Sequence, residues 1–144
     1  MEKNIHQFFA AYEKRFNDAI KGEMDVQGTA NAFGPYFVEA SPLGIHGGSN
    51  DLEFHKRIPQ GMEFYKKIGT HKMEITDEAV TPLDDYHYMV KIHWKAYYKN
   101  KDNTDLIIEI DVIYFLQHLN NELKIFAYIT GDEQDVLRKH GLIQ

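Results

Sequence analysis

The sequence contains no cysteine, which excludes disulfide bonds, thiolate metal sites and cysteine nucleophiles. This absence fits a cytoplasmic protein, and we expect that location. No stretch approaches the roughly 20 consecutive apolar residues that a membrane-spanning helix needs. Charged residues interrupt the N-terminal stretch MEKNIHQFFAAYEKRF, and its apolar runs are too short for a signal peptide. We therefore expect no membrane partner.

Positive charge is also scarce, with 16 Lys and Arg against 22 Asp and Glu and a net charge of −6. Because binding to a phosphate backbone depends on clustered cations, and no basic stripe is present, we expect no nucleic-acid partner. The 144 residues contain no repeat, no low-complexity segment and no linker. We expect a single domain spanning residues 1–144, and a chain of this length buries roughly 68–70% of its unfolded surface.

Eight histidines invite a search for a metal site, but no pair has the tight spacing of metal ligands. His87 and His93 would share one strand face about 20 Å apart. The pair Gly47-Gly48 matches neither phosphate-loop template, and no Gly-x-Ser-x-Gly motif occurs. We expect no metal and no cofactor.

The stretch over residues 86–132 predicts three long antiparallel strands joined by two polar turns. β-Branched and aromatic residues dominate each run, and clusters of turn-forming residues bound the runs. A first turn centred on residues 100–104 sets four pairs opposite one another: Ile92 and Val112, His93 and Asp111, Trp94 and Ile110, and Lys95 and Glu109. A slip of one residue would set charges against apolar side chains, so the pattern favours this register.

The second turn is predicted at residues 120–121, where two asparagines tolerate the positive φ of a tight hairpin. This register places Phe115 against Phe126 and Ile113 against Tyr128. The sheet would then have one uniformly apolar face and one mixed face, with charges at one end and aromatic rings at the other.

The other elements are predicted from apolar spacing, capping residues and breakers. A first helix follows from an apolar stripe formed by Ile5, Phe8, Phe9, Tyr12, Phe16 and Ile20. Further helices are expected from Asp25 to Phe33, from Pro59 to Gly69 and after Asp132, with strands over residues 36–40, 52–54 and 72–82 and a loop over residues 44–50. Helices at the front and antiparallel strands at the back predict an α+β fold, with helices covering one face of a curved sheet.

Three segments resemble the nuclear transport factor 2-like superfamily, which includes ketosteroid isomerases and SnoaL-type polyketide cyclases. They are the aromatic N-terminal helix, the segment YFVEASPLG at residues 36–44, and the strand IDVIYF at residues 110–115 followed by residues 125–131. The resemblance implies a cystatin-like cone, in which a curved, mixed, mainly antiparallel sheet wraps around an N-terminal helix pair and a third helix. It also implies homodimers formed through the outer face of the sheet, and a pocket between the helices and the inner face.

Two residues of this sequence match functional positions of the ketosteroid isomerases. Asp111 falls where those enzymes keep a protonated carboxylic acid in the oxyanion hole, and Tyr12 lies on the first helix where they place a phenol donor. Their general-base aspartate falls at Ser41, which cannot act as a base at neutral pH. Glu39 is close by in sequence, and strand alternation places it on the same face as Ser41.

The pair His93 and Asp111 has two interpretations. As an acid–base dyad inside the pocket, the carboxylate would favour the protonated ring and tune its pKa. As a solvent-exposed cross-strand pair, it would contribute a fraction of a kcal/mol, roughly 0–1. Periodicity favours the exposed pair, because it turns the apolar face toward the core, whereas the resemblance turns Asp111 inward.

Aromatic residues supply the candidate ligand contacts, with simple packing as the alternative. The candidates are Tyr12, Phe37, Phe115, Phe126 and Tyr128. The leading hypothesis is a homodimer that binds a small organic molecule and catalyses proton transfer, such as isomerisation, cyclisation or dehydration, with His93 and Asp111 as the catalytic pair. The alternative is a non-catalytic dimerisation or protein-association module whose pocket is filled by its own aromatic side chains.

Overall fold

A six-stranded sheet is the frame of the molecule, and a computed structural model describes it within residues 1–144. The strands are β1 (Phe33–Ser41), β2 (Gly44–Ser49), β3 (Thr70–Pro82), β4 (His87–Lys99), β5 (Asp105–Leu119) and β6 (Glu122–Ile129). Their order across the sheet is β2-β1-β6-β5-β4-β3, and only the β1–β6 pair is parallel. The expected mixed, mainly antiparallel sheet is therefore confirmed.

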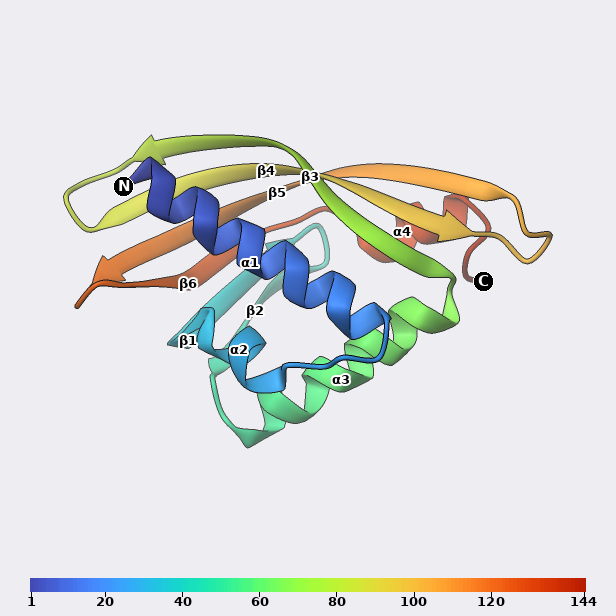
Figure 1. Cartoon of the computed structure of the whole chain (residues 1–144), viewed down its shortest axis with the longest axis horizontal. Coiled ribbons are helices and arrows are strands. Elements are labelled where there is room, and N and C mark those ends of the chain that lie inside the picture. Colours follow the sequence, from blue (N-terminus) through green and yellow to red (C-terminus); the bar gives the residue numbers. More distant parts are fainter.

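The helices are α1 (Glu2–Ile20), α2 (Val26–Asn31), α3 (Leu52–Lys67) and α4 (Glu133–Lys139). Figure 1 shows α1 running across one face of the sheet beside β3, with α2 and α3 next to each other on the same side. We call this the inner face and the opposite one the outer face. The expected α+β class is confirmed, and none of the four helices is both long and apolar enough to cross a membrane.

The hairpin of β4 and β5 has the predicted register. Trp94 pairs with Ile110 and His93 pairs with Asp111. Along both strands the even-numbered residues point inward and are mostly buried, while the odd-numbered residues point outward. The apolar face of the hairpin therefore meets the helices, as periodicity predicts.

The second hairpin has the predicted turn but not the predicted register. Asn120 and Asn121 adopt φ values of 52° and 61°, which suits a tight two-residue turn. The pairing then shifts by one residue between Phe115 and Leu116, so Phe115 pairs with Ala127 rather than with Phe126. An extra residue in β6 causes this β-bulge, and it moves every later side chain of β6 to the opposite face.

Three predicted boundaries are wrong. Phe33 begins β1 instead of ending a helix, and residues 44–49 form β2 instead of a loop. Residues 52–54 belong to α3, because the carboxylate of Asp51 accepts a hydrogen bond from the amide of Phe54 and caps the helix there. Pro59 consequently lies inside α3 and not in its first turn.

The pairing of β2 has a physical explanation. All six of its residues are exposed. None has to be apolar, so the segment shows no alternation of apolar and polar residues in the sequence. Strand pairing needs only backbone groups, and β2 pairs with β1 from Tyr36–Ser49 to Ser41–Gly44. Hydrophobic periodicity cannot predict a strand that is held by backbone hydrogen bonds alone.

Side chains of α1 connect the helix to the backbone of β3, the edge strand. The amide of Asn17 donates to the carbonyl of Met73 at 2.8 Å and accepts from the N–H of the same residue at 2.8 Å. One turn earlier, the carboxylate of Glu13 accepts from the N–H of Ile75 at 2.6 Å. Asn17 thus pairs with β3 as a neighbouring strand would, and fixes where α1 lies.

Asn17→Ala is expected to lower the free energy of unfolding by about 1–3 kcal/mol, because it leaves two partly buried backbone groups without a partner. Urea denaturation followed by circular dichroism measures the change. Asn31→Ala is the matched control, since Asn31 ends α2 and makes only an exposed side-chain bond to Gln27. Equal losses in the two variants would show that the Asn17 contact does not hold α1 on the sheet.

Candidate functional site

A cavity of about 250 Å³ lies between the helices and the inner face of the sheet. It is lined by Tyr12, Phe16, Glu39, Tyr65, Met73, Trp94, Tyr98, Ile110, Val112, Tyr114, Tyr128, Thr130 and Glu133. Helices α1 and α3 supply one wall, the strands β1 and β3 to β6 supply the other, and α4 adds its first residue, Glu133. The alternation of β4 and β5 explains why only their even-numbered residues reach it.

The aromatic walls carry hydrogen-bonding atoms. The indole N–H of Trp94 donates to the hydroxyl of Tyr114 at 3.2 Å. The rings of Tyr12 and Trp94 lie 6.2 Å apart, and those of Tyr12 and Tyr114 lie 6.1 Å apart. Burial raises the pKa of Tyr12 to about 12 and that of Tyr98 to about 12. These phenols are therefore neutral near pH 7 and available as donors.

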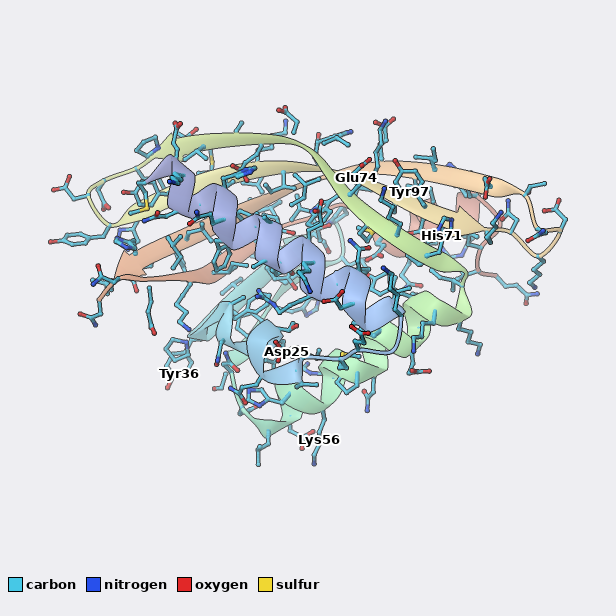
Figure 2. All side chains as sticks on the ribbon, viewed as in Figure 1. Asp25, Tyr36, Lys56, His71, Glu74 and Tyr97 are labelled. Carbon is cyan, nitrogen blue, oxygen red and sulfur yellow. The ribbon has the colours of Figure 1, made fainter.

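Two carboxyl groups enter the cavity, each held by a tyrosine. The hydroxyl of Tyr128 donates to Glu39 Oε2 at 3.2 Å, and the hydroxyl of Tyr65 donates to Glu133 Oε1 at 2.7 Å. Glu39 points inward because β1 alternates, while Tyr36 on the same strand points outward (Figure 2).

Glu133 reaches the cavity through the start of α4. Asp132 caps this helix by accepting a hydrogen bond from the amide of Asp135 at 3.0 Å. Burial raises the pKa of Glu133, an effect that outweighs the opposing hydrogen bond from Tyr65, and the charge of Glu39 raises it further. Glu133 therefore holds a proton more readily than a surface glutamate, which suits a general acid.

No Lys, Arg or His lines this cavity. A second cavity of about 200 Å³ shares Tyr12, Phe16 and Tyr65 with the first and is also lined by Arg15. The Nε atom of Arg15 is buried without a hydrogen-bond partner. The two cavities thus differ in charge, with carboxyls in the first and a guanidinium in the second.

Of the residues predicted to bind a ligand, Tyr12 and Tyr128 line the cavity. Tyr128 does so because the bulge in β6 turns it inward, which the predicted register did not include. Phe37 is also on the inner face, but it packs outside the cavity, with its ring 4.8 Å from Phe33 and 4.7 Å from Phe54. Its observed contacts are those of a core residue.

The predicted pair of His93 and Asp111 forms, but on the outer face. Nδ1 of His93 lies 2.6 Å from Asp111 Oδ1, and Nε2 lies 2.9 Å from Glu109 Oε1. The Asp111 side chain is 48% exposed, so the expected pocket position of the pair is corrected. Placing the pair inward would have buried charges and exposed the apolar face, which is unfavourable on both counts.

Phe115 and Phe126 also lie on the outer face, with ring centroids 6.2 Å apart. Their expected position in the pocket is corrected. Phe115 is an odd-numbered residue of β5 and points away from the helices, and Phe126 of β6 packs beside Phe115 and His87. Polar contacts lie elsewhere on this face, and Figure 2 shows Tyr97 and Glu74 next to each other there, with the Tyr97 hydroxyl donating at 2.8 Å.

Several cavity residues were not among the predicted sites. Tyr65 and Tyr114 have the spacing of core residues. This spacing predicts that they are buried, but it does not predict that their hydroxyl groups face a cavity. Glu133 follows a helix cap, and the residues on either side of it, Asp132 and Gln134, are polar and give no sign of burial. Only the strand alternation around Glu39 gave a usable signal. No group of three or more His, Asp or Glu side chains is placed to hold a metal ion.

A family model described as NTF2-like protein (DUF6841) matches residues 2–133. This span covers every strand and all three helices of the inner face. No curated protein matches the sequence.

Solved structures share the fold at low sequence identity. An NTF2-like protein with a cystatin-like fold from Novosphingobium aromaticivorans has a TM-score of 0.70 at 10% identity, over 99% of this chain and 88% of that chain. The protein Aln2 from a Streptomyces species has a TM-score of 0.65 at 16% identity, over 94% and 92%. A ketosteroid isomerase-like protein from Erwinia carotovora atroseptica has a TM-score of 0.63 at 14% identity, over 88% and 92%. These likenesses confirm the expected fold.

The His93 network makes a testable electrostatic prediction. Hydrogen bonds to Glu109 and Asp111 raise the pKa of His93, so Asp111→Asn should lower that pKa, as measured by NMR titration of the ring protons. Because the folded-state pKa is raised, the network stabilises the fold fully below about pH 6.5, the unfolded value, and this contribution is lost as pH rises through the folded pKa. Asp84→Asn, next to His87, is the control. An unchanged His93 pKa in Asp111→Asn would refute the assignment.

Proposed function

The chain belongs to the DUF6841 family of NTF2-like proteins, and on this basis we propose that it binds a small organic molecule in the inner-face cavity and catalyses proton transfer on it without a cofactor. The observation that carries the proposal is the pair of carboxyls, Glu39 and Glu133, each held by a tyrosine hydroxyl inside a mostly aromatic lining. A purely structural core has little use for two half-buried carboxyls, because withdrawing them from water without a compensating charge costs stability.

The size of the cavity limits the ligand. Ligand pockets commonly occupy about 300–1,000 Å³, and this cavity of about 250 Å³ lies just below that range. The proposed ligand is therefore small, about the size of one substituted aromatic ring. Stacking against the surrounding rings favours a flat or ring-shaped molecule.

The proposed chemistry divides proton transfer between the two carboxyls. Glu39 accepts a proton from the bound molecule, and Tyr128 holds its carboxylate in place. Glu133, whose raised pKa favours the protonated form, supplies a proton at another position of the ligand. The hydroxyl of Tyr12 orients the ligand and stabilises an oxygen that gains negative charge. Isomerisation, cyclisation and dehydration all fit this arrangement.

Two further observations support this proposal over a non-catalytic association module. The likeness to a ketosteroid isomerase-like protein supports small-molecule chemistry as a use of this fold. A pocket filled by its own aromatic rings would leave no space, whereas this one keeps a cavity with polar groups on its walls. The position of Ser41 requires a base other than the isomerase aspartate, and Glu39 on the same strand can take that role.

A ligand test separates binding from simple packing. In a thermal-shift screen of small phenols and cyclic ketones, a ligand at about 100 times its dissociation constant should stabilise the protein by about 2.7 kcal/mol. Ile110→Phe fills the cavity and should abolish the shift. Ile45→Phe is the matched control, because it makes the same change at an exposed residue of β2.

The same hits test catalysis. Incubated with the protein in deuterium oxide, a substrate should exchange carbon-bound hydrogen for deuterium, as followed by NMR. Glu39→Gln should slow this exchange by roughly 10²–10⁴-fold, whereas Glu53→Gln on the exposed side of α3 should not. Binding without deuterium exchange would show that the protein binds the ligand but does not catalyse proton transfer on it. If no compound stabilises the protein, the association module becomes the better account.

We also propose that two copies of the chain associate through the outer face of the sheet. Exposed apolar side chains lie there on β5 and β6, with Phe126 and Ile129 toward one end and Ile107 toward the other, beyond Glu109 and Asp111. The ring of Phe126 packs against the rings of Phe115 and His87, with centroid distances of 6.2 and 5.8 Å, and the residue is 37% exposed. A dimer would cover this apolar group and leave the helical side free.

Sedimentation velocity over a range of concentrations tests the dimer. The unmodified protein should sediment as a dimer, and Phe126→Glu should shift it to a monomer because a charge would be buried in the interface. Leu52→Glu is the control, since it places the same charge at an exposed apolar residue on the helical side. A monomer at every concentration would contradict the proposal.

A further inference from the structure

We infer that the inner-face cavity selects small organic cations, with an ammonium group held between Glu39 and Glu133 and against the tyrosine rings. The inference rests on the proposed ligand-binding function and names the chemical class of the ligand. It follows from three features of the cavity: its uncompensated negative charge, its free carboxyl oxygens and its ring lining.

All ionisable groups of the cavity that can carry a charge near pH 7 are acidic. Two of its lining residues carry carboxyl groups, and none carries a positive charge. Within the chain, only neutral tyrosine hydroxyls stabilise these carboxyls. A buried carboxylate is stabilised most by a cation close to it, and the protein itself supplies none. A bound cation would complete the site.

Each carboxyl also keeps one oxygen available. Tyr128 occupies Oε2 of Glu39, and Tyr65 occupies Oε1 of Glu133. The other oxygen of each group accepts no hydrogen bond within the chain. An ammonium group donates up to three hydrogen bonds and accepts none, so it matches a site that offers acceptors from two sides. Bonds between an ammonium and a carboxylate are about twice as strong as neutral ones.

The ring lining favours the same class. Seven of the 13 lining residues are aromatic: Tyr12, Phe16, Tyr65, Trp94, Tyr98, Tyr114 and Tyr128. The faces of aromatic rings attract cations, most strongly when water is excluded, and Trp is the best of them. A neutral ligand would gain the apolar contacts and neutral hydrogen bonds but no ion pair, and an anion would be repelled by each carboxyl that is ionised.

The neighbouring cavity provides the contrast. Arg15 lines it, together with the shared side chains of Tyr12, Phe16 and Tyr65. Its guanidinium forms no ion pair within the chain, so an anionic ligand would bind there instead. Cation binding therefore belongs to the cavity of Glu39 and Glu133, and a comparison of ligands that differ only in charge can tell the two apart.

Cation binding should also release a proton. Burial raises the pKa of Glu133, and an ammonium beside it favours the ionised form and lowers that pKa again. At a pH between the two values, binding drives a proton from Glu133 into solution. This release accompanies a cation and not a neutral molecule of the same shape, with which Glu133 keeps its proton and remains the general acid of the proposed reaction.

Isothermal titration calorimetry with 2-phenylethylamine, 2-phenylethanol and phenylacetate tests the inference, since the three differ mainly in charge. We expect the amine to bind about tenfold or more tightly than the alcohol, and phenylacetate to bind most weakly. Titrations in two buffers of different ionisation enthalpy should show proton release with the amine alone. Glu133→Gln should abolish that release, and Glu39→Gln should reduce the preference for the amine by about tenfold.

Controls separate the outcomes. Glu53→Gln makes the same change of charge at an exposed residue of α3 and should alter neither affinity nor proton release. Thermal unfolding confirms that each variant folds. If the alcohol binds as tightly as the amine, the cation preference is overturned while ligand binding stands. If phenylacetate binds best and Arg15→Gln abolishes its binding, the ligand is an anion of the second cavity. If none of the three binds and the wider screen also fails, both proposals fall.

Discussion

The double hydrogen bond between the side chain of Asn17 and the backbone of Met73 sets the position of α1, and the cavity depends on that position. Met73 lies in the edge strand and also lines the cavity. Because Tyr12 and Phe16 project from the same helix, a shift of α1 would move two walls at once. The helix therefore does more than cover apolar surface, since it spaces the aromatic residues from the sheet and keeps the cavity open.

The inner face combines two opposing requirements. Its aliphatic and aromatic side chains stabilise the fold by leaving water, whereas its carboxyls are costly to bury. Protein interiors are normally packed without voids, so a cavity next to two carboxyls departs from both rules at one place. Departures of this kind are expected where function has required them. Tyr65 and Tyr128 limit the cost by donating hydrogen bonds without adding charge.

Sequence reasoning succeeded where a pattern is local and repeated. The alternation of β4 and β5 predicted the pairing of Trp94 with Ile110, because a slip would have exposed a whole apolar face. It failed at the bulge of β6, since one inserted residue leaves no mark in composition yet turns Tyr128 inward. The position of Glu133 was also beyond reach, because it depends on how α4 docks after the sheet has formed. The fold was thus largely predictable, and the polar half of the site was not.

The two faces of the sheet show that surroundings, more than residue type, decide what a carboxyl can do. Asp111 on the outer face has a histidine partner at 2.6 Å, but water surrounds the pair and weakens its electrostatics. On the inner face, Glu133 has only a phenol as partner, yet burial, helped by the charge of Glu39, shifts its pKa upward. The pair that the sequence favoured as catalytic, His93 and Asp111, therefore has weaker electrostatic interactions than the inner-face carboxyl. A search for function in this fold should begin with buried carboxyls that lack a cation, because there a ligand's charge has the largest effect.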